Sequence, residues 1–295
     1  MTMRYAKLLM FAVPLLWVGG CSDDDGVTDL GPIPPQALIR FINAVPDTGT
    51  VDFRFIDKVE NLPMLMGVAL QQTSGFFQRT DGGARHVRIF PFSSLPGVTS
   101  VAVLDTTITL DGNNTRQTLV YTGRAAGNQD RLVIIPEDVP PPTPPANSIA
   151  IRVLHVAYGT TAPVGNVDVH IVPVTSATAA TPADWQTTRV AQISNVAYLS
   201  KSAYVNVPVR PTTTGALYRF VVTAAGSTTP LFAVTPNQPG LAAPAGASYG
   251  PQPGMQISGS VFTAAVIGAP IAGTKDAPAT PTATVTLMPD KVLNP

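Results

Sequence analysis

Two stretches of the chain share one pattern and decide the fold: "IRFINAVPDTGTVDFRFI" at residues 39–56 and "IRVLHVAYGTTAPVGNVDVHIV" at residues 151–172. Each begins with Ile-Arg and two apolar residues, and each continues after a turn with Val-Asp and an apolar residue. Further pairs of segments match in the same order: 67–78 with 195–206, 86–91 with 217–222, and 132–139 with 285–292. Matches in one order indicate a tandem repeat, with a period long enough for each copy to be a domain.

The local pattern within each copy is that of β-strands. Val51, Phe53 and Phe55 alternate with polar residues, and the stretch 167–171 repeats this alternation. Alternation with period two predicts strands that bury one face. Glycine-containing stretches at 80–84 ("TDGGA") and 110–114 ("LDGNN") are typical of hairpin turns. Seven or eight short strands in each copy, with frequent Pro and Gly and no convincing amphipathic helix, predict an all-β chain of two β-sandwiches.

The stretch "RFINAVPDTGTVDF" at residues 40–53 resembles a bacterial family, domain of unknown function 4397 (DUF4397). The matching residues are Arg40, Asn43, Ala44, Pro46, Asp47, Val51 and Asp52. The second copy keeps Arg152, His155, Val167 and Asp168, but its turn is longer and lacks Pro-Asp, while Tyr204 and Val207-Pro208 resemble a downstream part of the family pattern. The resemblance implies tandem immunoglobulin-like antiparallel β-sandwich domains on exported bacterial proteins, without catalytic residues.

Breaks in composition divide the chain into segments. An acidic stretch rich in Pro and Gly ends at residue 36, and five prolines lie between residues 140 and 145. Because a stiff Pro-rich spacer separates the copies, we expect few contacts between them and independent folding. The predicted segments are a signal peptide at 1–20, acylated Cys21 with a flexible, disordered tether at 21–36, repeat one at 37–139, a linker at 140–147, and repeat two with loop insertions at 148–292.

The only cysteine of the chain, Cys21, follows the apolar run 8–18, which is preceded by Arg4 and Lys7. A basic start and a short apolar run predict a secretory signal peptide, since a membrane-spanning helix needs about 20 apolar residues. The residues 18–21, Val-Gly-Gly-Cys, resemble the lipobox of bacterial lipoproteins. The resemblance implies cleavage by signal peptidase II between Gly20 and Cys21, followed by acylation of Cys21. The alternative is an ordinary signal peptide with an unrelated cysteine.

The predicted anchor also determines the expected location. Two or three acyl chains hold a protein on a membrane essentially permanently, whereas one chain holds it only marginally. Ser22 follows the cysteine. In enteric bacteria an aspartate at that position retains lipoproteins in the inner membrane, so the resemblance favours the outer membrane of the cell envelope.

Composition excludes one class of partner. Arg4 and Lys7 are two of the 18 basic residues, so the mature chain keeps 16 against 18 acidic ones, a net charge of −2. Charged residues make up only 12% of the chain. Nucleic-acid binding requires a basic footprint, so we expect no nucleic-acid partner. A single cysteine provides no structural disulfide, and the apolar core must therefore supply the stability.

Candidate catalytic and metal-binding motifs lack the required context. The stretch "GASYG" at 246–250 fits the pattern of a nucleophilic Ser248, but prolines on both sides forbid the necessary strand and helix. His86, His155 and His170 all precede it, and no third ligand accompanies His155 and His170, which are expected on neighbouring strands. We expect His86 and His170 to face solvent. The sequence thus predicts no enzyme and no catalytic, cofactor-binding or metal-binding residue.

The residues that recur in both copies are predicted to be structural. These are Arg40 and Asp52 in repeat one, and Arg152 and Asp168 in repeat two. The preferred interpretation of the aspartates is a buried or turn-bonding carboxylate, and the alternative is a ligand contact shared by both domains.

A few aromatic residues are candidates for an exposed binding face. Adjacent phenylalanines such as Phe76 and Phe77 cannot both point inward in a strand, and Tyr198 and Tyr204 lie in the corresponding region of repeat two. Packing at the edges of strands or domains is the preferred interpretation, and a sugar-binding platform is the alternative. The insertions near 175–190 and 236–254 are expected to be long exposed loops.

These observations predict a non-enzymatic, membrane-anchored envelope lipoprotein that serves as a structural or adhesive interaction module. Its expected partners are a membrane, through acylated Cys21, and an envelope protein or glycan. The alternative function is a module that binds envelope polysaccharide or peptidoglycan. Fold alone does not decide between these functions.

Overall fold

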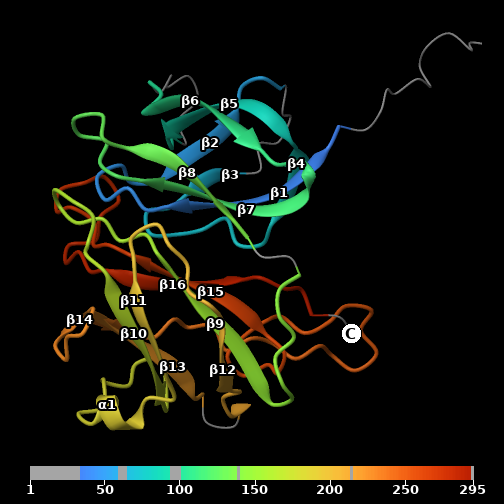
Figure 1. Ribbon diagram of the computed structural model, residues 1–295, viewed down its shortest axis with the longest axis vertical. Helices are drawn as coiled ribbons and strands as arrows, with labels where there is room; N and C mark the ends of the chain where they lie inside the picture. Colours follow the sequence, from blue (N-terminus) through green and yellow to red (C-terminus); the bar gives the residue numbers. More distant parts are fainter. Residues whose placement is uncertain (1–33, 59–64, 94–100, 138–139, 213–214, 294–295) are drawn as a thin grey trace, which may run out of the picture. The chain divides into compact units, whose positions relative to one another are not determined.

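In a computed structural model of the protein, each of the two halves of the chain forms a pair of four-stranded sheets, so the prediction of two tandem β-sandwiches is confirmed (Figure 1). The structure describes residues 34–58, 65–93, 101–137, 140–212 and 215–293. The signal peptide, Gly20, Cys21 and the tether up to residue 33 lie outside the described residues. Residues Pro35–Pro295 form one compact unit.

Repeat one contributes eight strands within the part of the chain that is described. One sheet has the order β4-β1-β7-β8, and the other has the order β3-β2-β5-β6. The strands are β1 (Gln36–Asn43), β2 (Val51–Phe55), β3 (Leu65–Val68), β4 (Gln78–Asp81), β5 (Gly83–Pro91), β6 (Leu104–Leu110), β7 (Asn113–Thr122) and β8 (Arg131–Pro136).

Repeat two has the same strand order, with each strand eight places later. Its sheets are β12-β9-β15-β16 and β11-β10-β13-β14. The strands are β9 (Ser148–His155), β10 (Val167–Val174), β11 (Ala191–Val196), β12 (Val205–Pro208), β13 (Leu217–Ala224), β14 (Pro230–Val234), β15 (Val261–Ile267) and β16 (Thr284–Pro289).

The described strands of each sandwich pair mostly antiparallel, as expected, but they include one parallel pair. β1 pairs with β7 in parallel, and β9 pairs with β15 in parallel. β7 and β15 enter their sheets from β6 and β14, which belong to the opposite sheets. Such a crossover permits parallel pairing, whereas a tight hairpin requires antiparallel strands.

Crossovers from one sheet to the other also show that both predicted hairpins are wrong. Residues 80–84 lead from β4 to β5 and residues 110–114 lead from β6 to β7, and in each case the two strands lie in different sheets. These turns are therefore corners of the sandwich. A Cβ atom at Gly82 would collide with the backbone of Gly112. Glycine is needed at these corners because their backbones approach each other closely. A tight hairpin turn also requires glycine, so the sequence alone does not distinguish the two structures.

Each sandwich has its own apolar core between its two sheets. In repeat one, Phe53 packs against Phe41 and Phe55 at ring-centroid distances of 5.1 and 5.2 Å. In repeat two, strands from both sheets contribute to one buried cluster that includes Phe220 and Phe262. Alternating residues of the strands fill these cores, as period-two patterning predicts.

The insertions of repeat two distinguish it from repeat one. The connection between β6 and β7 consists of residues 111–112, whereas the corresponding connection between β14 and β15 consists of residues 235–260. The insertion after β10 contains the short helix α1 (Trp185–Thr188). Among the described residues, no helix has the length and apolar character needed to cross a membrane.

Candidate functional site

The recurring arginines occupy equivalent buried positions in the two sandwiches. Arg40 in β1 and Arg152 in β9 are 0% and 1% exposed. Each donates a hydrogen bond from Nε to a threonine on the parallel neighbouring strand, Thr118 or Thr263, at 2.8 Å. The threonine hydroxyl in turn donates to the carboxylate that follows the last strand, which is Glu137 in repeat one.

The second carboxylate of this arrangement is Asp290, which accepts a hydrogen bond of 2.7 Å from Thr263. Arg40 joins the two repeats, because its Nη2 lies 2.9 Å from Glu137 Oε1 and its Nη1 lies 2.9 Å from Asp290 Oδ1. Arg152 forms a further ion pair with Glu137. We call Arg40, Glu137, Arg152 and Asp290 the arginine–carboxylate network; it has two charges of each sign.

Aromatic rings cover the two arginines. The guanidinium carbon of Arg40 lies 4.4 Å from the ring centre of Phe77, and that of Arg152 lies 4.6 Å from the ring centre of Tyr204. These rings are equivalent, because each immediately precedes the first paired residue of β4 or β12. The Tyr204 hydroxyl also donates to Asp290 at 2.9 Å. Both rings therefore hold arginines in place by cation–π contact.

Neither carboxylate of the network was singled out from the sequence, although a signal was present. The matching segments at 132–139 and 285–292 place Glu137 and Asp290 at the same position, directly after a proline. A buried arginine requires a charged partner, because an isolated buried charge is very costly. The recurrence of an arginine and of an acidic residue in both repeats therefore indicated that the two are ion-pair partners.

Apolar residues surround the network and join the repeats. One buried cluster contains side chains from both sandwiches, and we call it the interrepeat cluster. Its members are Ile42, Ala44, Val120 and Ile135 of repeat one, and Leu154, Val156, Ala265, Ile267 and Met288 of repeat two. The expectation of few contacts between the repeats is therefore wrong. The Pro-rich linker separates the repeats along the sequence, but the strands β1 and β9 are buried on both faces over most of their length.

The connection between β15 and β16 adds polar contacts across the same boundary. Ile271 donates its backbone N–H to the carbonyl of Pro46 at 2.8 Å, and Asp276 accepts from the backbone N–H of Thr50 at 3.1 Å. The Tyr198 hydroxyl lies 2.7 Å from Thr122 Oγ1. Tyr198 lies in the connection between β11 and β12. Repeat two thus contacts repeat one through two connections as well as through a sheet.

Asp52 and Asp168 each support a β-bulge. Asp52 accepts the backbone N–H of Gly67 at 2.8 Å, and Asp168 accepts that of Asn195 at 2.7 Å. Gly67 and Asn195 are equivalent residues with φ of 63° and 55°, in the left-handed region. A bulge leaves a backbone donor without a ladder partner, and the carboxylate accepts it. This is the environment of a turn-bonding carboxylate.

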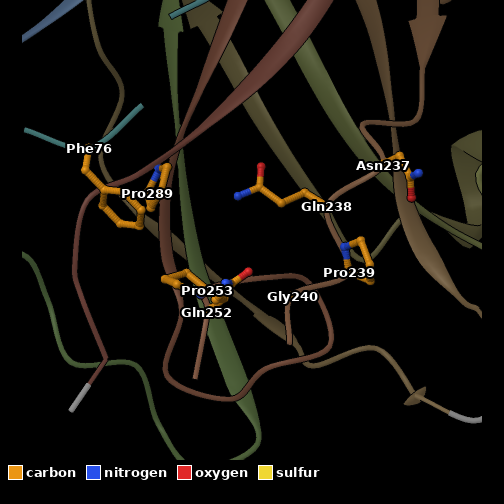
Figure 2. Close-up of a pocket in the computed structure, with 8 residues that line it drawn as sticks. All are labelled: Phe76, Asn237, Gln238, Pro239, Gly240, Gln252, Pro253 and Pro289. Atoms are coloured by element: carbon orange, nitrogen blue, oxygen red, sulfur yellow. The ribbon is translucent and has the colours of Figure 1, made fainter. Parts of the chain in front are cut away.

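The exposed aromatic candidate is Phe76, which lies beside a cavity of about 460 Å³ (Figure 2). Phe76 is 45% exposed, whereas the neighbouring Phe77 is half-buried over the arginines. Figure 2 shows the side chain of Gln238 extending toward Phe76, which lies next to Pro289. The other lining residues are Asn237, Pro239, Gly240, Gln252 and Pro253. We call this cavity the Phe76 pocket; it combines residues of both repeats.

The histidines lie in three separate environments. His86 is partly exposed, as expected for a residue that faces solvent, and its ring pairs with Asp105. His155 is buried, and its Nε2 lies 3.0 Å from the carbonyl oxygen of Gly165. His170 was expected to face solvent but is only 3% exposed, because Trp185 from α1 packs against its ring at 4.7 Å.

His155 and His170 were also expected on neighbouring strands, but β9 and β10 belong to different sheets. Within the described ranges, no group of three or more His, Cys, Asp and Glu residues is arranged to hold a metal ion. Ser248 lies in an exposed turn of the 235–260 connection, with neither a strand before it nor a helix after it.

Two buried groups predict how stability depends on pH. Burial raises the pKa of Glu137. The charges of Arg40, Arg152 and Lys201 and the hydrogen bond from Thr118 together outweigh burial and hold this pKa below its ordinary value of 4.5. Burial lowers the pKa of His155 below its ordinary value of 6.5. In both cases the unfolded state binds more protons, so stability falls as the pH falls.

We therefore expect the urea midpoint to decline as the pH drops below about 6.5, through His155, and further below about 4.5, through Glu137. The measurement is a series of urea unfolding curves from pH 8 to pH 3. His155→Gln should reduce the first decline and leave the second. Part of the first decline should remain, because burial and the charge of Arg189 also lower the pKa of His170. A midpoint that stays constant from pH 7 to pH 3 would contradict both assignments.

No curated protein sequence matches the chain. Among solved structures, the Bacillus anthracis TIE protein shares 10% identity with a TM-score of 0.22, over 79% of this chain and 33% of that one. The chain thus spans about a third of the TIE protein. A "putative adhesin" from Bacteroides ovatus shares 10% identity with a TM-score of 0.23, over 86% of this chain and 94% of that one.

Likenesses with TM-scores this low carry no argument about fold or function. The comparison with families is more specific. The matched segment begins in β1, includes all of repeat one and ends at His170 in β10. Residues 37–170 match the family "Domain of unknown function (DUF4397)", which confirms the resemblance seen at residues 40–53.

Proposed function

We propose that the protein is a non-enzymatic envelope module that is anchored to a membrane through acylated Cys21 and makes adhesive contacts through its two sandwiches. The observation that carries this proposal is the continuity between the repeats, through the arginine–carboxylate network and the interrepeat cluster. Repeats held in one orientation present loops of both as a single surface. Binding residues are characteristically found on loops that a rigid scaffold positions.

The anchor is proposed from the sequence at residues 18–21. The small residues Gly19 and Gly20 precede Cys21, and an apolar run precedes them. Two or three acyl chains would supply enough buried hydrocarbon for stable attachment, at about 0.8 kcal/mol for each methylene. Ser22 favours the outer membrane. These features support an exported, lipid-anchored protein that works in the cell envelope.

The experiment that tests the anchor is metabolic labelling with an alkyne fatty acid. Wild-type protein should incorporate the label and partition into detergent, because the acyl chains are attached to Cys21. Cys21→Ala should lose all label, while Ser22→Ala should keep it as a matched control. Equal labelling of wild type and Cys21→Ala, or no labelling of wild type, would contradict the lipoprotein proposal.

A further inference from the structure

The Phe76 pocket has a composition that restricts its ligand. Its eight lining residues include one phenylalanine and the three primary amides of Asn237, Gln238 and Gln252, and none of the eight carries a charge. The absence of charge in this lining disfavours anionic and cationic ligands, which require a charged partner when they are desolvated. Each primary amide both donates and accepts hydrogen bonds, which suits hydroxyl groups that do the same.

The wall opposite Phe76 is an ordered insertion. Residues 235–260 replace a corner of only two residues in repeat one. Leu241 and Gln252 exchange backbone hydrogen bonds of 3.2 and 2.8 Å, and Met255 donates to the carbonyl of Gln238 at 3.0 Å. Loops longer than about 12–15 residues without secondary structure are uncommon in compact domains and are usually functional or disordered. The internal hydrogen bonds of this loop show that it is ordered, which favours a functional role over disorder.

Met255 fixes this loop to the core of repeat two. Its side chain is fully buried, and its Sδ accepts the backbone N–H of Tyr218 at 3.0 Å. A Cβ atom at Gly254 would collide with the backbone of Gly240, so two segments of the loop lie in close contact. Preorganisation of this kind reduces the entropic cost of binding.

The arginine–carboxylate network contacts the remaining wall of the pocket, because Arg40 Nη1 donates to the carbonyl of Pro289 at 3.4 Å. Phe77 stacks on Arg40, and the preceding residue is Phe76. Asp290 pairs with Arg40, and the preceding residue is Pro289. The interface between the repeats therefore determines where the phenylalanine and the proline of the pocket lie. A single repeat would not form this pocket, because Phe76 and the amides come from different repeats.

We infer that the Phe76 pocket binds a neutral carbohydrate, with the Phe76 ring against the C–H face of a sugar and the amides hydrogen-bonded to its hydroxyl groups. This inference rests on the proposed binding function and names the ligand class of that surface. An open cavity of about 460 Å³ suits one or a few sugar rings of a longer chain. The competing ligand is a proline-rich peptide, which also docks on aromatic grooves. The three amides favour the sugar, because hydroxyl groups can pair with both the N–H donors and the carbonyl acceptor of each amide.

The test measures binding of neutral hexasaccharides of glucose, mannose and N-acetylglucosamine to the full chain in detergent, by titration calorimetry. At least one hexasaccharide should bind the wild-type protein. Phe76→Ala should weaken that binding at least tenfold, and Gln238→Leu should weaken it at least fivefold. Tyr249→Ala is the matched control, because Tyr249 is 60% exposed on the same loop but does not line the pocket. It should bind as wild type does.

Folding and ligand class are checked separately. Melting temperatures of the Phe76→Ala and Gln238→Leu variants should match the wild type, because neither side chain lies in a core cluster. A hexauronate of matched length should bind at least tenfold more weakly than the neutral sugar. Failure of every neutral hexasaccharide to bind, equal binding by Phe76→Ala, or binding of a proline-rich peptide in place of sugar would overturn the inference.

These outcomes are distinguishable from failure of the proposed function. If no sugar binds while wild-type protein incorporates the fatty acid and is crosslinked on cells to a defined envelope protein, the carbohydrate inference fails and the envelope module stands. If the fatty acid is not incorporated but the sugar still binds through Phe76, the anchor fails and the carbohydrate site stands.

Discussion

Glu137→Ala is expected to lower the free energy of unfolding by about 3–5 kcal/mol, which is the usual cost of removing one partner from a buried ion pair. Glu137 contacts Arg40 and Arg152, and both arginines are almost completely buried. Without this carboxylate, Asp290 is the remaining acidic partner of the two buried arginines, and Lys201 also loses an ion pair of 3.6 Å. For a domain of this size the loss corresponds to a decrease in melting temperature of roughly 10 °C.

The matched control for this substitution is Asp105→Asn. Asp105 is likewise a carboxylate that contacts more than one basic side chain, here His86 and Arg88, but its side chain is 46% exposed. Solvent screens an exposed pair, so its loss should leave the melting temperature nearly unchanged. Equal melting temperatures for wild type and Glu137→Ala, measured by circular dichroism, would show that the network contributes nothing to the folded state.

The second large effect is expected for repeat one alone. Residues 37–139 without repeat two expose Ile42, Val120 and Ile135, which are at most 6% exposed in the whole unit. Arg40 also loses Asp290. We expect the fragment to aggregate or to bind a hydrophobic dye without a cooperative thermal transition, because a large apolar face is exposed. The measurement combines size-exclusion chromatography with dye binding and thermal unfolding.

A pair of threonine substitutions distinguishes this cause from a general folding failure. Val120→Thr with Ile135→Thr should improve the solubility of the fragment, since these side chains then face water. The same pair should destabilise the full chain, where both positions are buried. A monomeric, cooperatively melting fragment with the wild-type residues would instead support independent folding of the repeats.

The strands and their pairing into two copies were predictable because period-two patterning and recurring motifs are local. The interface was predictable in part. β1 reads "QALIRFIN" and β9 reads "SIAIRVLH", and each has a central apolar run of five residues that only the arginine interrupts. Runs of this kind are typical of strands that are buried on both faces. The arginine in the middle of each run interrupts the apolar pattern, which makes this signal weaker.

The candidate site was only partly accessible from the sequence. The sequence identified Phe76 and Phe77 as candidates for an exposed aromatic face, with packing at strand or domain edges preferred. The residues opposite Phe76 lie more than 150 positions later, and no local pattern encodes that contact. His170 illustrates the same limit, because its strand position predicts exposure and only the insertion that carries Trp185 buries it. Close approach of Gly82 and Gly112 likewise depends on tertiary structure.

The arginine–carboxylate network and the interrepeat cluster are expected to make one cooperative unit of the two sandwiches. Differential scanning calorimetry of the full chain measures this cooperativity. We expect a single transition whose calorimetric enthalpy equals its van't Hoff enthalpy, as two-state unfolding requires. Two resolved transitions, or a calorimetric enthalpy about twice the van't Hoff value, would show that the repeats unfold independently and would contradict this expectation.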